Sequence, residues 1–366
     1  MIVEYFYCSS RSILLFSKYR IRSTISFKLL KWRGLPMTQN SNIAAREAGH
    51  QSSTDLVKPS PAPEKKSGIL YNYWKNRYLV LLLLPAILFF AIFCYGPMPG
   101  VIIAFKDYKF RLGIFKSPWV GLENFRMLFS IKSFGEVFRN TLIISVYKLL
   151  TGFPAPILFA LFLNEIRQQK FKKTVQTISY LPHFVSWVVL GGLFIQFLSP
   201  SAGPINVILK NLGMDPIFFL GDPKWFRSVL VVTSMWKGFG WGSIVYLASI
   251  TSISPQLYDA ADIDGAGRFR KMWSITLPEM VPVITIMLIF SVGGIVGDDF
   301  DQIFNLYNKA VYSVGDVLGT YIYRVGLVDM KYSFSAAVGL FRNVISFALV
   351  FLANFAANRV NEYGIW

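Results

Sequence analysis

Charged residues are scarce in this sequence of 366 amino acids, because Asp, Glu, Lys and Arg together make up only 16% of it. A soluble domain devotes roughly a quarter of its residues to these four types. Here 54% of the residues are hydrophobic, and the mean hydropathy is +0.45. The composition excludes an ordinary soluble domain and indicates an integral membrane protein.

Residues that carry catalysis or nucleotide chemistry are also few. The two histidines, His50 and His183, have no metal-binding spacing and no nucleophile motif beside them, which disfavours a membrane enzyme. The two cysteines, Cys8 and Cys94, cannot form a disulfide framework, because one lies in the N-terminal region and the other inside an apolar run. No G-x-x-x-x-G-K-[ST] phosphate cradle occurs in the sequence. We therefore expect no catalytic residue, metal site or cofactor in this chain.

Long apolar runs are what the sequence has instead. A membrane span needs roughly 20 apolar residues to cross about 30 Å of hydrocarbon. A membrane β-barrel would need strands of about ten alternating residues, whereas LVLLLLPAILFFAIF is apolar on every side. We predict an all-α polytopic fold with six transmembrane helices, the third beginning a turn before its apolar core. The predicted spans are Tyr78–Pro97, Asn140–Leu163, Phe184–Leu198, Ser228–Ser252, Met280–Gly297 and Phe334–Asn358.

Lys and Arg in the connecting segments predict the orientation of these spans. Residues 1–77 hold 13 Lys and Arg against 4 Asp and Glu, and NEIRQQKFKKT follows the second span. Both segments are predicted to be cytoplasmic, and six crossings then place both termini and Ser254–Glu279 there. The segment from Gly96 to Arg139 also carries cations, but at lower density. We assign the basic excess to topology and contact with anionic lipid, not to nucleic acid.

The N-terminal region differs from the rest. Residues 1–76 are predicted to be a cytoplasmic, largely disordered lead, and residues 77–366 the transmembrane domain. The polar, Pro- and Ser-rich composition begins at Met37. Residues 1–36 are expected either to be missing from the native protein, with Met37 as its start, or to form an amphipathic surface segment. N-terminal sequencing of the native protein distinguishes the two.

The polar stretch LYDAADIDGAG lies between the fourth and fifth predicted spans. Ser254-Pro255 predicts a helix start, because a serine hydroxyl caps free amides and proline fits the first helical position. Asp264-Gly265 predicts a stop after Ile263, with glycine in the left-handed conformation. A second short helix is expected over AGRFRKMWSI. The result is a cytoplasmic helix, turn and helix.

One side of the first short helix carries two adjacent small side chains. Leu257, Ala260, Ala261 and Asp264 fall at helical spacing. Two adjacent alanines make a surface of low relief, onto which another protein can close tightly. The alternative is a capped cytoplasmic connection with no partner. Residue spacing alone does not decide between a docking surface and such a connection.

The string LYDAADIDGAGRFRKMWSITLPEMVP resembles the EAA loop of permease subunits of ATP-binding-cassette (ABC) importers. Asp259 stands where Glu is usual, and Met272-Trp273 stand where Phe is common. The resemblance implies a type I importer permease fold whose loop, residues 254–279, contains the helix that docks on an ATPase. The matching positions are Ala260, Ala261, Asp264, Gly265, Ala266, Ile275, Leu277, Pro278 and Pro282. The ATPase-coupling residues it implies are Leu257, Asp259, Ala260, Ala261, Asp264, Gly265 and Ala266.

From about residue 70 onward the chain is similar to the sugar-permease branch, in particular to permeases for complex or uronic-acid oligosaccharides. VGLENFRMLF, MWKGFGWGSIVYLASI and FDQIFNLYN carry this resemblance. It implies ATP-driven import of a sugar across a bacterial cell membrane. The implied partners are a second permease, two ATPase subunits that use the ATP, and an extracellular solute-binding protein. The alternatives are a non-sugar solute and a proton-coupled carrier, which would not need the helix, turn and helix.

Charged side chains inside spans are costly and usually face a protein interior or an aqueous cavity. Nearby aromatic rings suit sugars, because they cover C–H surfaces while polar edges orient hydroxyls. The alternative is that the cations pair with the acids or extend to the membrane surface, and that the rings only pack. The candidate residues of a substrate pathway are Lys148, Trp236, Lys237, Trp241, Tyr246, Asp298, Asp299 and Arg342.

Overall fold

The structure is a computed structural model that describes residues 76–297, 299–361 and 364. The chain divides into two compact units at Pro97 and Met98. In the first unit the described residues form α3 (Arg77–Phe89) and the π-helix η1 (Phe90–Tyr95). No side chain of α3 is buried, so a helix that is apolar all round presents its whole surface, as a lipid-facing span does. The N-terminal segment before residue 76, which the sequence predicts to be largely disordered, lies outside the described residues. Asp298 lies outside them as well.

The second unit is also helical, and the described residues contain no strand, only an isolated bridge between Lys106 and Trp119. The predicted all-α fold class is confirmed. Its elements are η2 (Met98–Phe105), α4 (Gly113–Lys116), α5 (Glu123–Ser130), α6 (Lys132–Gly152), α7 (Pro154–Glu165), α8 (Gln169–Phe184), α9 (Trp187–Phe197), α10 (Pro204–Asn211), α11 (Pro223–Thr251), α12 (Pro255–Ile263), α13 (Arg268–Lys271), η3 (Met272–Thr276), α14 (Leu277–Gly293), α15 (Phe300–Leu306), η4 (Lys309–Val311), α16 (Tyr312–Gly315), α17 (Leu318–Tyr323), η5 (Arg324–Val328) and α18 (Tyr332–Asn361).

Within the described residues, four helical segments are long and apolar enough to cross a membrane, and a bent pair makes a fifth. The fourth predicted span corresponds to α11, which has 29 residues but is not among them. Lys224, Arg227, Lys237 and several hydroxyl residues lower its hydropathy. The count of six crossings therefore stays a prediction. The four segments are Arg77–Phe105, Lys132–Glu165, Arg268–Gly293 and Tyr332–Arg359.

The bent pair, α8 and α9, differs from the single helix that the sequence predicts for the third span. The two helices meet at 102°. Val185 and Ser186 between them are extended, and the Ser186 hydroxyl accepts a hydrogen bond from the Val189 amide at 3.4 Å. A new helix with its own cap therefore starts at Trp187, whereas we expected one helix starting a turn before Phe184.

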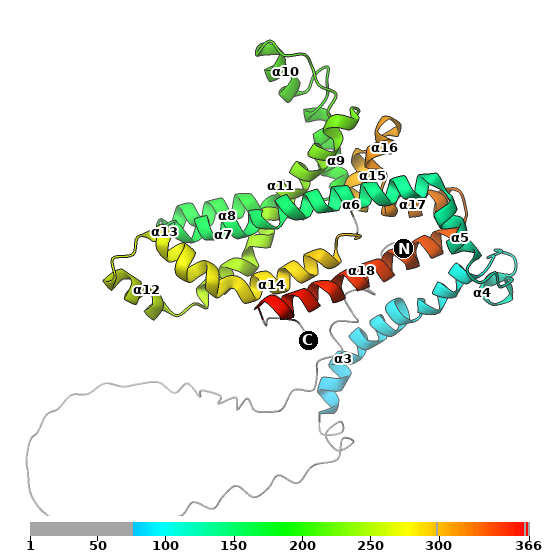
Figure 1. Ribbon diagram of the computed structural model, residues 1–366, viewed down its shortest axis with the longest axis horizontal. Helices are drawn as coiled ribbons and strands as arrows, with labels where there is room; N and C mark the ends of the chain where they lie inside the picture. Colours follow the sequence, from blue (N-terminus) through cyan, green and yellow to red (C-terminus); the bar gives the residue numbers. More distant parts are fainter. Residues whose placement is uncertain (1–75, 298, 362–363, 365–366) are drawn as a thin grey trace, which may run out of the picture. The chain divides into compact units, whose positions relative to one another are not determined.

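Helix α11 is the central element of the second unit and packs against α6, α7, α8 and α14 (Figure 1). A Cβ at Gly240 would lie 2.1 Å from the Ser179 carbonyl oxygen on α8. A Cβ at Gly242 would lie 3.1 Å from the Pro156 side chain on α7. Glycine at these positions lets three helices approach closely, as small residues do in membrane bundles.

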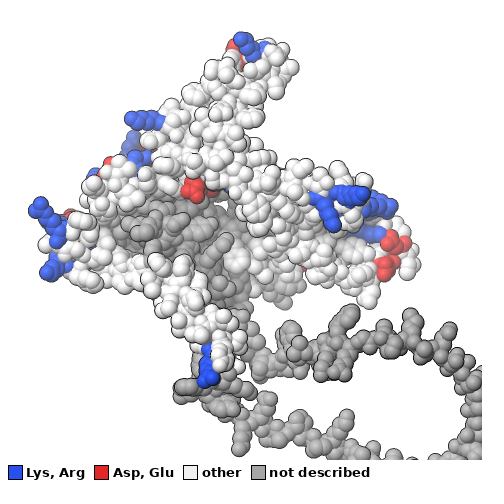
Figure 2. All heavy atoms as spheres, turned by 180° about the vertical axis from the view of Figure 1, so that it is seen from behind, with Lys and Arg blue, Asp and Glu red and all other residues white. Residues whose placement is uncertain are grey.

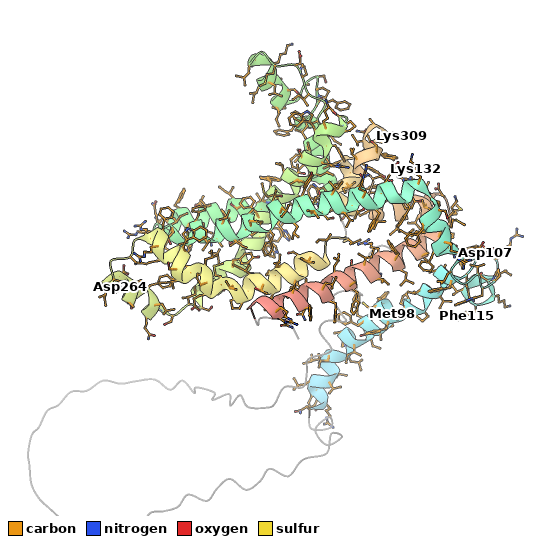
Figure 3. All side chains as sticks on the ribbon, viewed as in Figure 1. Met98, Asp107, Phe115, Lys132, Asp264 and Lys309 are labelled. Carbon is orange, nitrogen blue, oxygen red and sulfur yellow. The ribbon has the colours of Figure 1, made fainter. Side chains whose placement is uncertain are left out.

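A buried cluster connects η3 and α14 to the centre of this unit. Met272 and Met280 pack with Ala160 of α7 and with Tyr246 and Ile250 of α11. Helix α12 lies at one end of the unit, and α4 and α5 lie at the opposite end (Figure 1). The labelled side chains in Figure 3 show the same separation, with Asp264 at one end and Asp107 and Phe115 at the other.

Candidate functional site

Helix α12 has the bounds that the sequence predicts, Pro255–Ile263. Gly265 is left-handed, with φ of +70°. Its amide donates to the Asp262 carbonyl at 3.1 Å, and the Ala266 amide donates to the Ala261 carbonyl at 2.8 Å. These two bonds form a Schellman turn, which ends the helix by hydrogen bonds within residues 261–266. The shape of α12 therefore does not depend on a neighbour.

The start of α12 corrects one expectation. Ser254 occupies the N-cap position, but its hydroxyl makes no hydrogen bond to a helix amide. It donates instead to the side-chain oxygen of Gln256 at 3.0 Å. In this structure the hydroxyl acts as a donor to a side chain and not as the acceptor of a helix amide.

The surface of α12 is open. None of its residues is buried. Leu257 is 42% exposed and Ile263 is 88% exposed, while Ala260 is exposed and Ala261 is half-buried. Asp259, Asp264 and Gly265 are exposed as well, and Ala266 is half-buried. The predicted coupling residues therefore lie together on an accessible, low-relief surface at one end of the unit.

The second short helix predicted from AGRFRKMWSI is not separate. Instead α13, η3 and α14 run on as one helical segment, Arg268–Gly293, of 26 residues. Two side-chain contacts join α12 to it: Tyr258 Oη lies 2.8 Å from Thr276 Oγ1, and Lys271 pairs with Asp262. Sequence reasoning missed Tyr258, because nothing in its neighbours distinguishes a bonded tyrosine from an exposed one.

Basic side chains gather toward the two ends of the second unit in the view of Figure 2. One group lies near α12. It comprises Arg167, Lys170, Lys172, Lys173, Arg268, Arg270 and Lys271, all of them exposed or half-buried. The surface between the two ends is mostly uncharged in this view, which suits a band of lipid.

A hollow of about 400 Å³ lies between α6, α7, α11 and α14. Four of the predicted pathway residues line it: Lys148, Trp241, Tyr246 and Asp299. A second hollow of about 200 Å³ shares Lys148 with the first. Three serines, which the sequence gave no reason to select, add hydroxyls to the wall of the larger hollow: Ser145, Ser234 and Ser291.

Lys148 lies at the centre of a chain of polar contacts. Its ammonium is 2.9 Å from the Asp299 carboxylate, and it also donates to the Gln302 side-chain oxygen. The Gln302 amide then donates to Thr233 Oγ1 and to the Leu230 carbonyl, both at 2.8 Å. These polar contacts join α6, α11 and α15. The alternative expectation was that the cations inside the spans pair with nearby acids. The structure places one of these acids, Asp299, beside Lys148.

Lys237 does not line the hollow. Its ammonium donates to the carbonyls of His183 at 2.7 Å, Val185 at 2.8 Å and Pro182 at 3.3 Å, and it lies 5.6 Å from the centre of the Trp187 ring. These carbonyls belong to the end of α8, where a helix leaves acceptors without intrahelical partners. Lys237 therefore holds the break between α8 and α9 in its bent geometry.

Replacing Lys237 by Met is expected to lower the unfolding temperature of the purified protein in detergent. The three carbonyls lose a charged donor, and a hydrogen bond to a charged group contributes roughly 2 kcal/mol to stability. The matched control is Lys309→Met, which removes an exposed ammonium and should change the unfolding temperature little. An unchanged unfolding temperature for the Lys237 variant, together with lost uptake, would show that this ammonium serves the substrate instead.

The remaining predicted pathway residues lie elsewhere. Trp236 is 42% exposed and meets Phe194 edge to face at 5.8 Å. Arg342 donates from Nε to the Val296 carbonyl at 2.7 Å. Neither residue lines the hollow. Trp241, which does, stacks on His183 with ring centroids 4.6 Å apart.

A further ion pair, which the sequence analysis did not select, lies outside the predicted spans. Arg324 binds the buried Asp316 carboxylate with two nitrogens, one of them at 3.2 Å, and Thr320 donates to the same carboxylate. Burial by itself lowers the pKa of Arg324, but the hydrogen bonds and charge of Asp316 raise it overall. Burial, and then a hydrogen bond with Tyr312, raises the pKa of Tyr307 to about 12. Arg324 therefore stays charged at ordinary pH.

Residues 152–361 match the family model described as "Binding-protein-dependent transport system inner membrane component". Two relatives from Bacillus subtilis (strain 168) are each 42% identical to this chain. Protein LplB aligns over 80% of this chain and 92% of its own length. The polygalacturonan/rhamnogalacturonan transport system permease protein YteP aligns over 83% of this chain and 94% of its own length.

Two crystal structures are similar to this chain at 41% sequence identity and a TM-score of 0.74. One is a bacterial ABC transporter involved in the import of the acidic polysaccharide alginate, and it covers 80% of this chain and 99% of its own. The other is a bacterial alginate ABC transporter in complex with an alginate pentasaccharide-bound periplasmic protein, and it covers 81% and 99%.

Proposed function

Since this chain belongs to the family of binding-protein-dependent transport system inner membrane components, we propose that it is the permease subunit of an ABC importer for an acidic oligosaccharide. It is a multi-pass membrane protein and a transport component, not an enzyme. The observation that carries the choice of substrate is the likeness, at 41% and 42% identity over about four-fifths of the chain, to permeases for alginate and polygalacturonan. Both polymers bear carboxylates.

The hollow supports this substrate class. It offers one ammonium, from Lys148, with serine hydroxyls and the Trp241 ring, and a sugar acid needs a cation, hydrogen-bonding groups and an apolar face. The Lys148 side chain is 11% exposed and the Asp299 side chain 32% exposed, so Asp299 is the more accessible of the two. On this proposal, a sugar carboxylate takes the place of Asp299 beside Lys148 during passage. The chain supplies one wall of the pathway.

The remaining subunits follow from the same proposal. A second permease supplies the opposite wall, and an extracellular binding protein delivers the sugar. Two ATPase subunits hydrolyse the ATP, one of them docked on α12, so this chain needs no cofactor of its own. Both termini and α12 lie in the cytoplasm, as the distribution of Lys and Arg predicts. A proton-coupled carrier is less well supported, because Asp299 is paired with Lys148.

The test uses the complex that co-purifies with the tagged full-length chain, reconstituted in liposomes with its binding protein. Uptake of labelled oligogalacturonate is compared with uptake of its methyl ester, which has the same length and no charge. Losing a charge-assisted contact predicts about tenfold slower uptake of the ester. Equal uptake of both would overturn the acidic substrate, and uptake driven by a proton gradient without ATP would overturn the importer.

A further inference from the structure

We propose that the Tyr258 hydroxyl transmits the movement of α12 to α14, and that its loss separates ATP hydrolysis from sugar transport. The inference rests on the proposed function, because it concerns the route by which a docked ATPase moves this chain. Tyr258 is a positioning residue in this proposal. It acts through Thr276 and does not contact the sugar.

The first step is that α12 has little packing through which it could move its neighbours. None of its side chains is buried, and its C-terminal turn is closed by hydrogen bonds within the same segment. In the described part of the chain, two side-chain contacts join α12 to the helical segment that follows. These are the hydrogen bond between Tyr258 and Thr276 and the ion pair between Asp262 and Lys271.

The second step distinguishes these two contacts. The Asp262 side chain is 64% exposed, and exposed ion pairs contribute little, because water and salt screen them. Tyr258 is half-buried, and Thr276 is only 3% exposed. A hydrogen bond at this depth holds its geometry better than a pair in solvent. The Tyr258 contact is therefore the stronger link between α12 and the interior.

The third step follows the contact inward. Thr276 ends the π-helical turn η3 and directly precedes α14. Met272 of the same turn and Met280 of α14 belong to the buried cluster shared with α7 and α11. Close-packed interiors transmit displacement instead of absorbing it. Further along α14, Met287 and Ser291 line the larger hollow. A displacement of Thr276 thus reaches the wall of the proposed pathway.

The test measures sugar taken up per ATP hydrolysed by the complete importer in liposomes. Tyr258→Phe removes only the hydroxyl, and Thr276→Val removes its partner at nearly constant volume. Each is expected to lower the ratio by about twofold to tenfold, the range for one hydrogen bond, while the ATPase still co-purifies. The double variant should be no worse than either single variant, because both remove the same contact. Thr276→Ser keeps the hydroxyl and should restore coupling.

Ser254→Ala is the matched control, because it removes a hydroxyl of the same loop that donates to Gln256 and takes no part in the Tyr258 contact. Its ratio should equal that of the wild type. The inference is overturned if Tyr258→Phe keeps the wild-type ratio, if it releases the ATPase, or if Thr276→Val is silent. Failure of the proposed function is recognised separately, since the wild-type complex itself would then show no ATP-driven sugar uptake.

Discussion

Replacing Ala260 by tryptophan is expected to abolish ATP-driven uptake while the chain still folds in the membrane. Ala260 is exposed on α12, where no residue is buried, so an indole ring there disturbs no packing within the chain. It would, however, fill the space that a docked ATPase needs. A clash at an interface hot spot costs roughly 2 kcal/mol or more, which weakens binding about 30-fold.

Co-purification of the ATPase, uptake and the unfolding temperature measure this effect together. Ala310→Trp is the matched control, because Ala310 is also exposed but lies in η4, far along the chain from α12. We expect this control to keep uptake and ATPase binding. If Ala260→Trp retained full ATPase binding, α12 would not be the docking element and the proposed coupling residues would have to be abandoned.

Replacing Lys148 by Met is the second large expected effect. The change leaves the Asp299 carboxylate and the Gln302 amide oxygen without their ammonium partner. Breaking a buried ion pair by removing one partner costs roughly 3–5 kcal/mol. Because the Asp299 side chain is 32% exposed, we expect the lower end of that range. The measurement is thermal unfolding in detergent, followed by uptake of oligogalacturonate.

A paired variant separates the two roles of Lys148. Lys148→Met combined with Asp299→Asn removes both charges, so stability should largely return, whereas uptake of the acidic sugar should stay lost. Recovery of both would show that Lys148 is structural and does not meet the substrate. Recovery of stability alone supports the exchange of Asp299 for a sugar carboxylate.

The sequence predicts the bounds of the proposed coupling helix, α12, well because its signals are local. Ser254-Pro255 and Asp264-Gly265 lie next to the ends they specify, and the observed helix runs from Pro255 to Ile263. Even here the hydroxyl of Ser254 bonds the Gln256 side chain instead of a helix amide. The position of a helix end was predictable, but the choice among several nearby hydrogen-bond partners of the hydroxyl was not.

The candidate pathway was predicted less completely, because its contacts join residues distant in sequence. The carbonyls that hold Lys237 lie more than 50 positions away, and backbone carbonyls carry no sequence signal. Gln302 is uncharged, so the cost of burying charge did not point to it, although it is only 1% exposed and joins Lys148 to Thr233. The cost of burying charge did point to Lys148 and Asp299, since both are charged.

The break at Val185 and Ser186 divides the packing contacts of one hydrophobic stretch between two parts of the fold. Helix α8 packs against α11, whereas α9 packs against α15, where a Cβ at Gly191 would lie 2.9 Å from the Asn305 Cβ. One hydrophobic stretch of the sequence thus packs on two different partners, joined by two extended residues, and an aromatic contact also holds α9 against α11. Straightening the joint would pull α9 off these neighbours, so the bend is fixed from both sides and is not a free hinge.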